Sequence, residues 1–242
     1  MKILALDSSG IVASVAVVED DTLLAEYTVN YKKTHSQTLL PMLDEIVKMT
    51  ELELESVDAI AVAAGPGSFT GLRIGSATAK GLGLALKKPL VAVPTVDALA
   101  YNLYDAQGLI CPIMDARRKQ VYTGIYRFEE HQLMTLKEQW AAPIEELLEE
   151  LNQRGEMATF LGDGVPVFRE LIAEKLQVPY SFAPAHVNKQ RAAAVAALGS
   201  IYYKEGRTET AMEHIPEYLR VSQAERERAE REKEQKSAGT KI

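Results

Sequence analysis

Two aspartates in turn sequences are the first residues of this chain that could do chemistry. Asp7 follows a short apolar run and precedes Ser8 and Ser9, and Asp115 follows a second apolar run and lies two positions before Arg117. Carboxylates can orient Mg²⁺ or a water molecule, and small hydroxyl residues can hold phosphate. Aspartate and serine are also common turn formers, so an ordinary turn remains the alternative at both positions.

Three consecutive basic residues, Arg117, Arg118 and Lys119, follow Asp115 in a chain of net charge −7. The cluster predicts contact with an anion or a partner, and a solvated turn is the alternative. The acidic balance of the whole chain disfavours a free-standing nucleic-acid binder, because neutralising phosphates requires a basic surface. A basic patch, or a role beside a basic partner, is still compatible with it.

A glycine-rich turn between an apolar run and a helix-forming run is the other candidate site. Residues 64–75 read AGPGSFTGLRIG. Gly67 lets another group approach the backbone, and Ser68 and Thr70 could each cap the following helix, with Thr70 the natural N-cap of a helix beginning at Gly71. The free N–H groups at that helix N-terminus predict an anion cradle. It is not a Walker A loop, because no Gly-Lys-Ser/Thr follows. A strand-to-helix turn that merely needs small residues is the alternative.

Other catalytic signatures are missing from the sequence. No two of the four histidines, at positions 35, 131, 186 and 214, have the spacing that puts a metal-binding pair on one helix face. No serine or cysteine lies in a nucleophile elbow. The single cysteine, Cys111, lies in an apolar run and is predicted to be a buried structural thiol. These residue patterns give no support to a peptidase.

The elements that must position these residues repeat once along the chain. The first half is predicted as βββαβαβα over residues 3–6, 12–18, 22–31, 36–49, 59–64, 71–86, 90–93 and 96–104. The second half repeats this order over 109–114, 120–128, 133–139, 144–154, 158–161, 165–176, 180–182 and 189–204. The pattern predicts a duplicated α/β protein of the actin–hexokinase–Hsp70 (ASKHA, ribonuclease H-like) architecture. Its lobes would span 1–105 and 106–221, with the end of the second packing back on the first. Residues 215–220 are predicted to dock on the body, and 222–242 to form a charged, solvated or disordered tail.

A stripe of small residues marks the second predicted helix. Gly71, Gly75, Ala79 and Gly83 recur every four positions and therefore share one face. Such a face lets another helix backbone approach closely. That helix is either 36–49 of the same chain, with Ser36 as its cap, or a helix of another protein.

The bulk sequence indicates a protein of the cytoplasm. The 242 residues are 47% hydrophobic and 25% charged, as in ordinary globular proteins. A single cysteine excludes an internal disulfide and fits a reducing compartment. An aspartate at position 7 interrupts any amino-terminal signal sequence. No apolar run reaches the roughly 20 residues of a membrane span.

Five blocks of sequence together resemble the bacterial TsaB (YeaZ) family over residues 1 to about 222. They are residues 1–9, 35–41, 65–75, 114–117 and 216–220, of which the Gly-Pro-Gly-Ser-Phe-Thr-Gly-Leu-Arg-Ile-Gly block is the most specific. The resemblance implies an actin-like fold without catalysis of its own. The family's partners are the catalytic paralogue TsaD and the ATPase TsaE. Their complex transfers threonylcarbamoyl to the adenosine beside the anticodon of tRNA.

The resemblance also implies roles for particular residues. The partner interface would use the two helices, through Ser36, Leu39, Leu43, Gly71, Arg73, Gly75, Ala79 and Gly83. A vestigial nucleotide or anion cleft would contain Asp7, Ser8, Ser9, Gly67, Ser68, Asp115 and Arg117. No cofactor of its own is expected, because ATP and metal belong to the partner subunits. The chain would form a heterodimer with TsaD, a homodimer when alone, and would meet tRNA only within the complex.

A second hypothesis stays open beside this scaffold. The chain would be a weak ATPase or kinase-like enzyme of the actin–hexokinase superfamily, with Asp7 and Asp115 as its acids. It predicts that nucleotide binds the isolated chain and that Asp7→Ala abolishes the binding.

Overall fold

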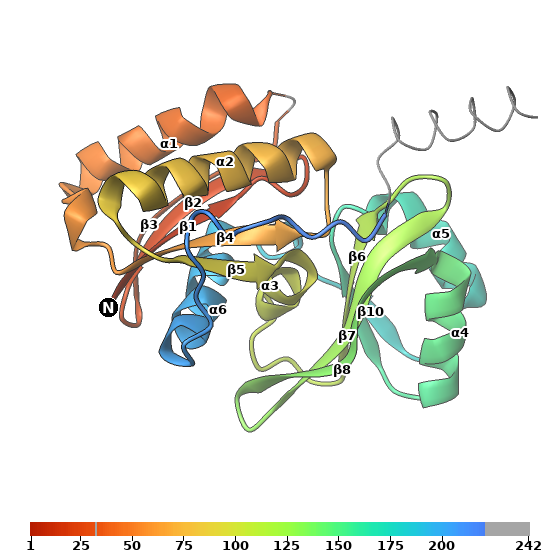
Figure 1. Cartoon of the computed structure of the whole chain (residues 1–242). Helices are drawn as coiled ribbons and strands as arrows, with labels where there is room; N and C mark the ends of the chain where they lie inside the picture. The colour runs from red at the N-terminus through yellow and green to blue at the C-terminus, as the bar shows by residue number, and fades with distance from the viewer. Residues whose placement is uncertain (32, 221–242) are drawn as a thin grey trace, which may run out of the picture.

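The computed structural model describes residues 1–31 and 33–220, which form two lobes side by side, each built on one sheet (Figure 1). The elements of the first half are β1 (Lys2–Asp7), β2 (Ala13–Glu19), β3 (Thr22–Val29), α1 (His35–Thr50), the 3₁₀ turn η1 (Leu54–Ser56), β4 (Ala59–Gly65), α2 (Phe69–Leu86), β5 (Leu90–Pro94) and α3 (Thr95–Tyr101). Those of the second half are β6 (Leu109–Asp115), β7 (Gln120–Glu129), β8 (Gln132–Pro143), α4 (Ile144–Arg154), β9 (Ala158–Leu161), α5 (Val165–Lys175), β10 (Tyr180–Phe182) and α6 (Ala192–Lys204).

The two sheets have the same topology, which confirms the predicted duplication. Their strand orders are β3-β2-β1-β4-β5 and β8-β7-β6-β9-β10. In each sheet the first strand pairs antiparallel with the second and parallel with the fourth. The end of each first strand, at Asp7 and at Asp115, therefore occupies an equivalent place in its lobe.

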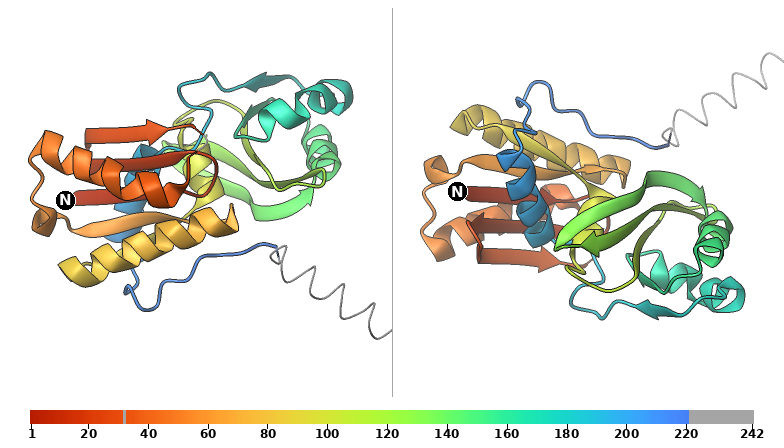
Figure 2. Two further views of the ribbon diagram at one scale, coloured as in Figure 1. Left: turned by 90° about the horizontal axis from the view of Figure 1, so that it is seen from above. Right: turned by 90° about the horizontal axis from the view of Figure 1, so that it is seen from below.

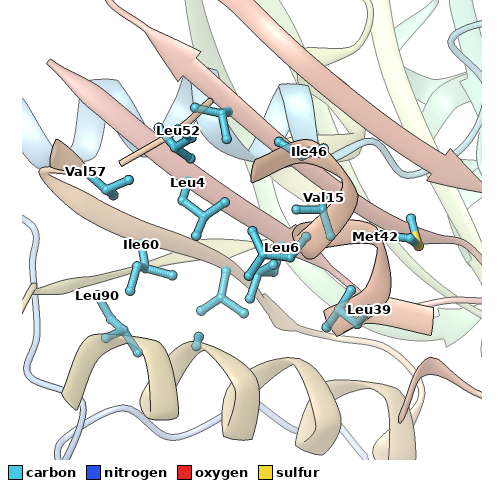
Figure 3. Packing of buried hydrophobic residues seen from close by; sticks show 14 of the residues in the cluster. Leu4, Leu6, Val15, Leu39, Met42, Ile46, Leu52, Val57, Ile60 and Leu90 are labelled. Atoms are coloured by element: carbon cyan, nitrogen blue, oxygen red, sulfur yellow. The ribbon is translucent and has the colours of Figure 1, made fainter. Parts of the chain in front are cut away.

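The first sheet is covered on both faces, which explains why its strands are apolar almost without interruption. Side chains alternate along β1, so Leu4 and Leu6 point toward α1 and α2, whereas Ile3 and Ala5 point toward α6. Figure 3 shows the cluster beneath α1 and α2, and Figure 2 shows α6 on the opposite face. Gly199 allows α6 to pack closely on the sheet, since a Cβ there would stand 2.7 Å from that of Ala61.

The last helix of each half lies at the junction of the lobes. α6 comes late in the sequence but packs on the first sheet, and α3 packs on the second, where Val96, Leu99 and Ala100 join one cluster with Ile110 of β6. The lobes are thus joined by an exchange of helices, and the chain segment after residue 105 is not confined to one lobe. α4 and α5 cover the second sheet with Leu147, Phe168 and neighbouring residues.

Residues 205–220, here called the strap, return along α2 and end at the second lobe (Figure 1). The backbones of Glu209 and Leu90 exchange two hydrogen bonds of 2.8 and 2.9 Å. The Glu217 N–H donates to Ala64 O at 2.7 Å, and the guanidinium of Arg220 donates to the backbone oxygen of Ala116. The predicted docking of 215–220 is confirmed, whereas the predicted tail at 222–242 lies outside the described residues.

Two predicted helix caps are wrong. α2 begins at Phe69, and its N-cap is Ser68, whose Oγ accepts a hydrogen bond from Gly71 N, so Thr70 lies within the first turn. α1 begins at His35 after Thr34, with no side-chain cap, so Ser36 is inside the helix. Serine and threonine two residues apart are equivalent as sequence signals, and tertiary packing decides between them.

Some element bounds also differ from the prediction. β8 extends to Pro143 because its pairing with β7 continues beyond residue 139 to the Gln120–Pro143 pair. β3 ends at Val29, α3 at Tyr101, and α6 begins only at Ala192. Among the described residues, no helix is both long enough and apolar enough to cross a bilayer.

Candidate functional site

The carboxylate of Asp7 is held by its own turn. Its Oδ1 accepts hydrogen bonds from Ser9 N at 2.9 Å and from Ser9 Oγ at 2.7 Å, and the residue is only 1% exposed. Burial raises the pKa of Asp7 from 3.8 to about 6, although the Ser9 hydrogen bonds act in the opposite direction. The first candidate acid is therefore sequestered from solvent.

The glycine-rich turn is filled by the chain itself. Ser68 N donates to Ser9 O at 2.7 Å, and Ser8 Oγ donates to Gly71 O at 2.9 Å. A Cβ at Gly67 would stand 2.3 Å from Ser9 O. The glycines are needed because the β1–β2 turn approaches the start of α2, which is an intramolecular use of the close approach that the sequence indicated.

The second candidate acid is engaged in a separate turn. Asp115 Oδ1 accepts from Arg117 N at 2.8 Å, and its Oδ2 forms an ion pair with the Arg117 guanidinium at 3.2 Å. Asp163, which the sequence analysis did not select, accepts a hydrogen bond from Asp115 N at 3.1 Å, and burial raises its pKa. Among the hydrogen bonds and ion pairs of the described residues, none joins Asp7 to Asp115. The described part of the chain also contains no cluster of three or more potential metal ligands.

Gln190 is a residue of this region that sequence reasoning missed. It is 2% exposed, and its amide nitrogen and oxygen make no hydrogen bond to any described residue. The side chain lies against Gly10, where a Cβ would stand 2.9 Å from Gln190 Nε2. His35 Nε2 forms a 2.8 Å hydrogen bond with Gly10 O on the same turn. No sequence signal identified a lone glutamine before a helix.

The predicted small-residue stripe faces the interior of the first lobe, as in the internal alternative, and its use as a partner interface stays a prediction. Gly71, Gly75, Ala79 and Gly83 are all buried in the first lobe. Added Cβ atoms would stand 2.4 Å from Ser8 Oγ at position 75 and 2.4 Å from Leu90 Cδ1 at position 83. The helix approaches a sheet, not a second helix.

Other predicted interface residues divide by burial. Leu39 and Leu43, predicted as interface residues, are buried in the core beneath α1. Ser36 and Arg73 are exposed. Arg73 Nε lies 3.3 Å from the hydroxyl of Tyr218 in the strap, and Tyr218 stacks on Phe69 with ring centroids 4.6 Å apart.

A second stripe of small residues, shifted by two positions, is exposed on α2. It consists of Ala77, Gly81 and Ala85, again four residues apart, and a Cβ at Gly81 would meet nothing within 4 Å. Leu84 beside it is 62% exposed, and the neighbouring α1 contributes Leu40 at 54%. We call Ala77, Gly81, Leu84, Ala85 and Leu40 the outer face of the helix pair.

A buried series of hydrogen-bonded side chains connects α2 to the strap. Ser76 Oγ lies 2.8 Å from His214 Nε2, and His214 Nδ1 lies 2.6 Å from Glu209 Oε1. Lys80 Nζ donates to the backbone oxygen of His214 at 2.9 Å. The order Ser–His–Glu resembles a hydrolase triad, but Ser76 and His214 are buried, so no substrate carbonyl can approach the hydroxyl.

The duplicated sheets, the exchanged helices and the paired Asp turns define an actin-like α/β protein. A family model described as TsaD, tRNA N6-adenosine threonylcarbamoyltransferase, matches residues 22–228. The tRNA threonylcarbamoyladenosine biosynthesis protein TsaB of Bacillus subtilis is 34% identical over 93% of this chain and 96% of its own length. The TsaB protein of Escherichia coli is 32% identical over 91% of this chain and 95% of its own. The solved structure of YeaZ from Pseudomonas aeruginosa superposes with a TM-score of 0.77 at 26% identity, covering 90% of this chain and 99% of that one. The chain belongs to the TsaB (YeaZ) family.

Proposed function

We propose that this chain is a non-catalytic subunit in the formation of threonylcarbamoyladenosine in tRNA, and that it supports a TsaD-type transferase by binding it. The observation that carries the proposal is the exposed Ala77–Gly81–Ala85 stripe on α2. Relatives matched along nearly their whole length are named for this biosynthesis, which supports the same pathway here.

The outer face has the properties of a helix-binding surface. Glycine within a helix costs up to about 1 kcal/mol relative to alanine, and at Gly81 no contact with a described residue explains that cost. The apolar side chain of Leu84 is exposed three positions after the glycine on α2, and Leu40 is exposed on the neighbouring α1. A partner helix can therefore reach the α2 backbone and bury apolar surface at the same time. We propose that the same surface mediates self-association when the transferase is absent.

The state of the Asp7 turn supports a role without chemistry. Its carboxylate is buried and already accepts two hydrogen bonds from Ser9, while Gly67 and Ser68 pack on the Ser9 backbone. In this proposal nucleotide and metal belong to the transferase and to a TsaE-type ATPase.

Co-purification tests the proposed interface. Ala77→Arg places a long charged side chain on the outer face and should abolish co-purification with the TsaD-type transferase, while circular dichroism stays that of the unchanged chain. Ala173→Arg makes the same substitution at an exposed position of α5 and should bind normally. Retained binding in Ala77→Arg would contradict the proposal.

One observation favours the alternative of a weak ATPase. The buried amide of Gln190 beside Gly10 makes no hydrogen bond to a described residue and is thus free to bind a ligand. Calorimetric titration of the full chain with millimolar ATP tests this alternative. Heat that disappears in Asp7→Ala supports it, and absence of heat discards it.

A further inference from the structure

The β6–β7 hairpin presents three consecutive basic side chains to solvent. Arg117, Arg118 and Lys119 are all exposed, with 84% of the Arg117 side chain accessible. This is the only run of three basic residues in the sequence, and it occurs in a chain of net charge −7. In Figure 1 the hairpin tip lies at the upper edge of the second lobe, beside the end of the strap.

The hairpin tip has an unusual backbone. All three residues have a left-handed backbone conformation, with φ of 65°, 55° and 59°. Left-handed conformation costs a non-glycine residue roughly 1–2 kcal/mol. Glycine or asparagine would adopt these angles at lower cost, yet the chain has basic residues at each position. The cost is understandable if the side chains are needed for binding.

Hydrogen bonds hold the tip in this conformation. Ala116 N donates to Gln120 O at 3.0 Å, Gln120 N donates to Arg117 O at 3.1 Å, and Ile144 N donates to Lys119 O at 3.4 Å. Arg220 at the end of the strap donates to Ala116 O and adds a fourth cationic group. The basic side chains thus extend from a fixed backbone, which lowers the entropy lost on binding.

Two of the three cations have no hydrogen-bond or ion-pair partner among residues 1–31 and 33–220. Arg117 pairs with Asp115, whereas the side chains of Arg118 and Lys119 make no hydrogen bond or ion pair within the described residues. Exposed cations on a fixed backbone, without a partner in the described part of the chain, fit a polyanion with regularly spaced charges. The sugar–phosphate backbone of RNA has this chemistry.

We propose that Arg118 and Lys119 contact backbone phosphates of the tRNA when this chain is bound to its transferase partner. The proposal rests on the proposed function, which supplies the RNA. The helices α1 and α2 lie at the upper edge of the first lobe in Figure 1, the same edge as the hairpin tip. One bound complex can therefore use the outer face for protein and the hairpin for RNA. Phosphate contacts of this kind position the RNA without reading its sequence.

The salt dependence of tRNA binding tests this proposal. Binding of a tRNA transcript to the complex of full chain and transferase is measured by filter binding between 50 and 300 mM KCl. In Arg118→Ala/Lys119→Ala the slope of log affinity against log salt should fall in magnitude by about 1.5, and affinity should fall roughly ten- to thirtyfold near 0.1 M salt. Arg118→Lys keeps the charge and should therefore keep the salt slope of the unchanged chain.

A control removes the same charge elsewhere. Lys175→Ala/Lys204→Ala loses two exposed lysines at the ends of α5 and α6 and should leave the slope unchanged. An unchanged slope in the hairpin variant overturns the proposal. Loss of transferase co-purification in that variant also overturns it, because the hairpin would then bind protein. If the unchanged chain does not bind the transferase at all, the proposed function itself fails, which is a separate result.

Discussion

Gly71 lies against the carbonyl oxygen of Ser8 so closely that a Cβ atom at position 71 would stand 2.0 Å from that oxygen. The contact joins the first turn of α2 to the turn after β1, and Ser8 Oγ donates back to Gly71 O at 2.9 Å. A glycine that looked like part of an anion cradle is required by intramolecular packing. Substitutions can therefore distinguish the buried stripe of α2, which contains Gly71, from the exposed stripe, which contains Gly81.

Alanine at positions 71 and 81 should have opposite effects on stability. Gly71→Ala forces a methyl group into backbone and should lower the free energy of unfolding by about 3 kcal/mol or more. Gly81→Ala adds a methyl group where there is open space and should raise that free energy by up to about 1 kcal/mol. Urea denaturation of the full chain measures both. Equal denaturation midpoints for the two variants would show that positions 71 and 81 do not differ in their packing.

Asp7→Asn should stabilise the protein at neutral pH. Burial raises the pKa of Asp7 from 3.8 to about 6. Between these values the native state retains a proton that the unfolded state has released, so the free energy of unfolding falls as pH rises through this window. The asparagine oxygen can still accept from Ser9. A difference of about two pKa units corresponds to roughly 3 kcal/mol, which should be the advantage of the variant at pH 7.5.

The pH dependence distinguishes this effect from ordinary repacking. Well below the unfolded-state pKa of 3.8 the aspartic acid is neutral in both states, so the advantage of Asp7→Asn should vanish there. Asp20 gives a control of opposite sign, because its hydrogen bond with the amino terminus lowers its pKa. Asp20→Asn should therefore lose stability above pH 4. An Asp7→Asn advantage that is constant from pH 4 to 8 would exclude the burial explanation. Thermal melts across this range measure both variants.

The contact between α2 and the strap depends on Ser76. Ser76→Ala leaves the buried Nε2 of His214 without its partner at 2.8 Å and should cost about 1–3 kcal/mol. Ser200 is a matched control, since it is also a buried helical serine but only bonds back to Ala196 O. Ser200→Ala should cost less than half as much. Limited proteolysis of the strap should be faster in Ser76→Ala. An unchanged cleavage rate would show that the Ser76–His214 hydrogen bond does not hold the strap on α2.

The sequence patterns predicted the strands well and the use of the glycines poorly. Apolar runs such as 59–64 indicate a buried strand whatever covers it, and the repeated order of elements then determines the duplicated topology. A spacing of four positions identifies a shared helix face at Gly71 and Gly75, but it carries no information on whether a sheet or a partner meets that face. The exposed stripe that contains Ala77 and Gly81 has the same four-residue spacing. Only the burial of each residue in the structure distinguishes it from the buried stripe.

Long-range polar contacts were the other part that the sequence could not predict. Ser76 and His214 are 138 positions apart, and neither has a neighbour that indicates the pairing. Gln190 lies against Gly10 only because α6 crosses to the first sheet. The basic run at 117–119 was visible, but its left-handed backbone was not, because arginine and lysine are uncommon in that conformation.

A carboxylate at the lobe junction should couple two tyrosines from different elements. Asp97 of α3 accepts hydrogen bonds from Tyr126 of β7 at 2.7 Å and from Tyr202 of α6 at 3.3 Å, and burial raises the pKa of Asp97. Tyr126→Phe removes the shorter bond and should lower the free energy of unfolding by about 1–3 kcal/mol, because a buried acceptor loses its donor. In a double-mutant cycle, Tyr126→Phe with Asp97→Asn should show a coupling energy of about 1 kcal/mol or more. Tyr104→Phe, at an exposed tyrosine, should change stability by less than about 0.5 kcal/mol. Additive effects of Tyr126→Phe and Asp97→Asn would show that this hydrogen bond contributes no coupling energy to the junction.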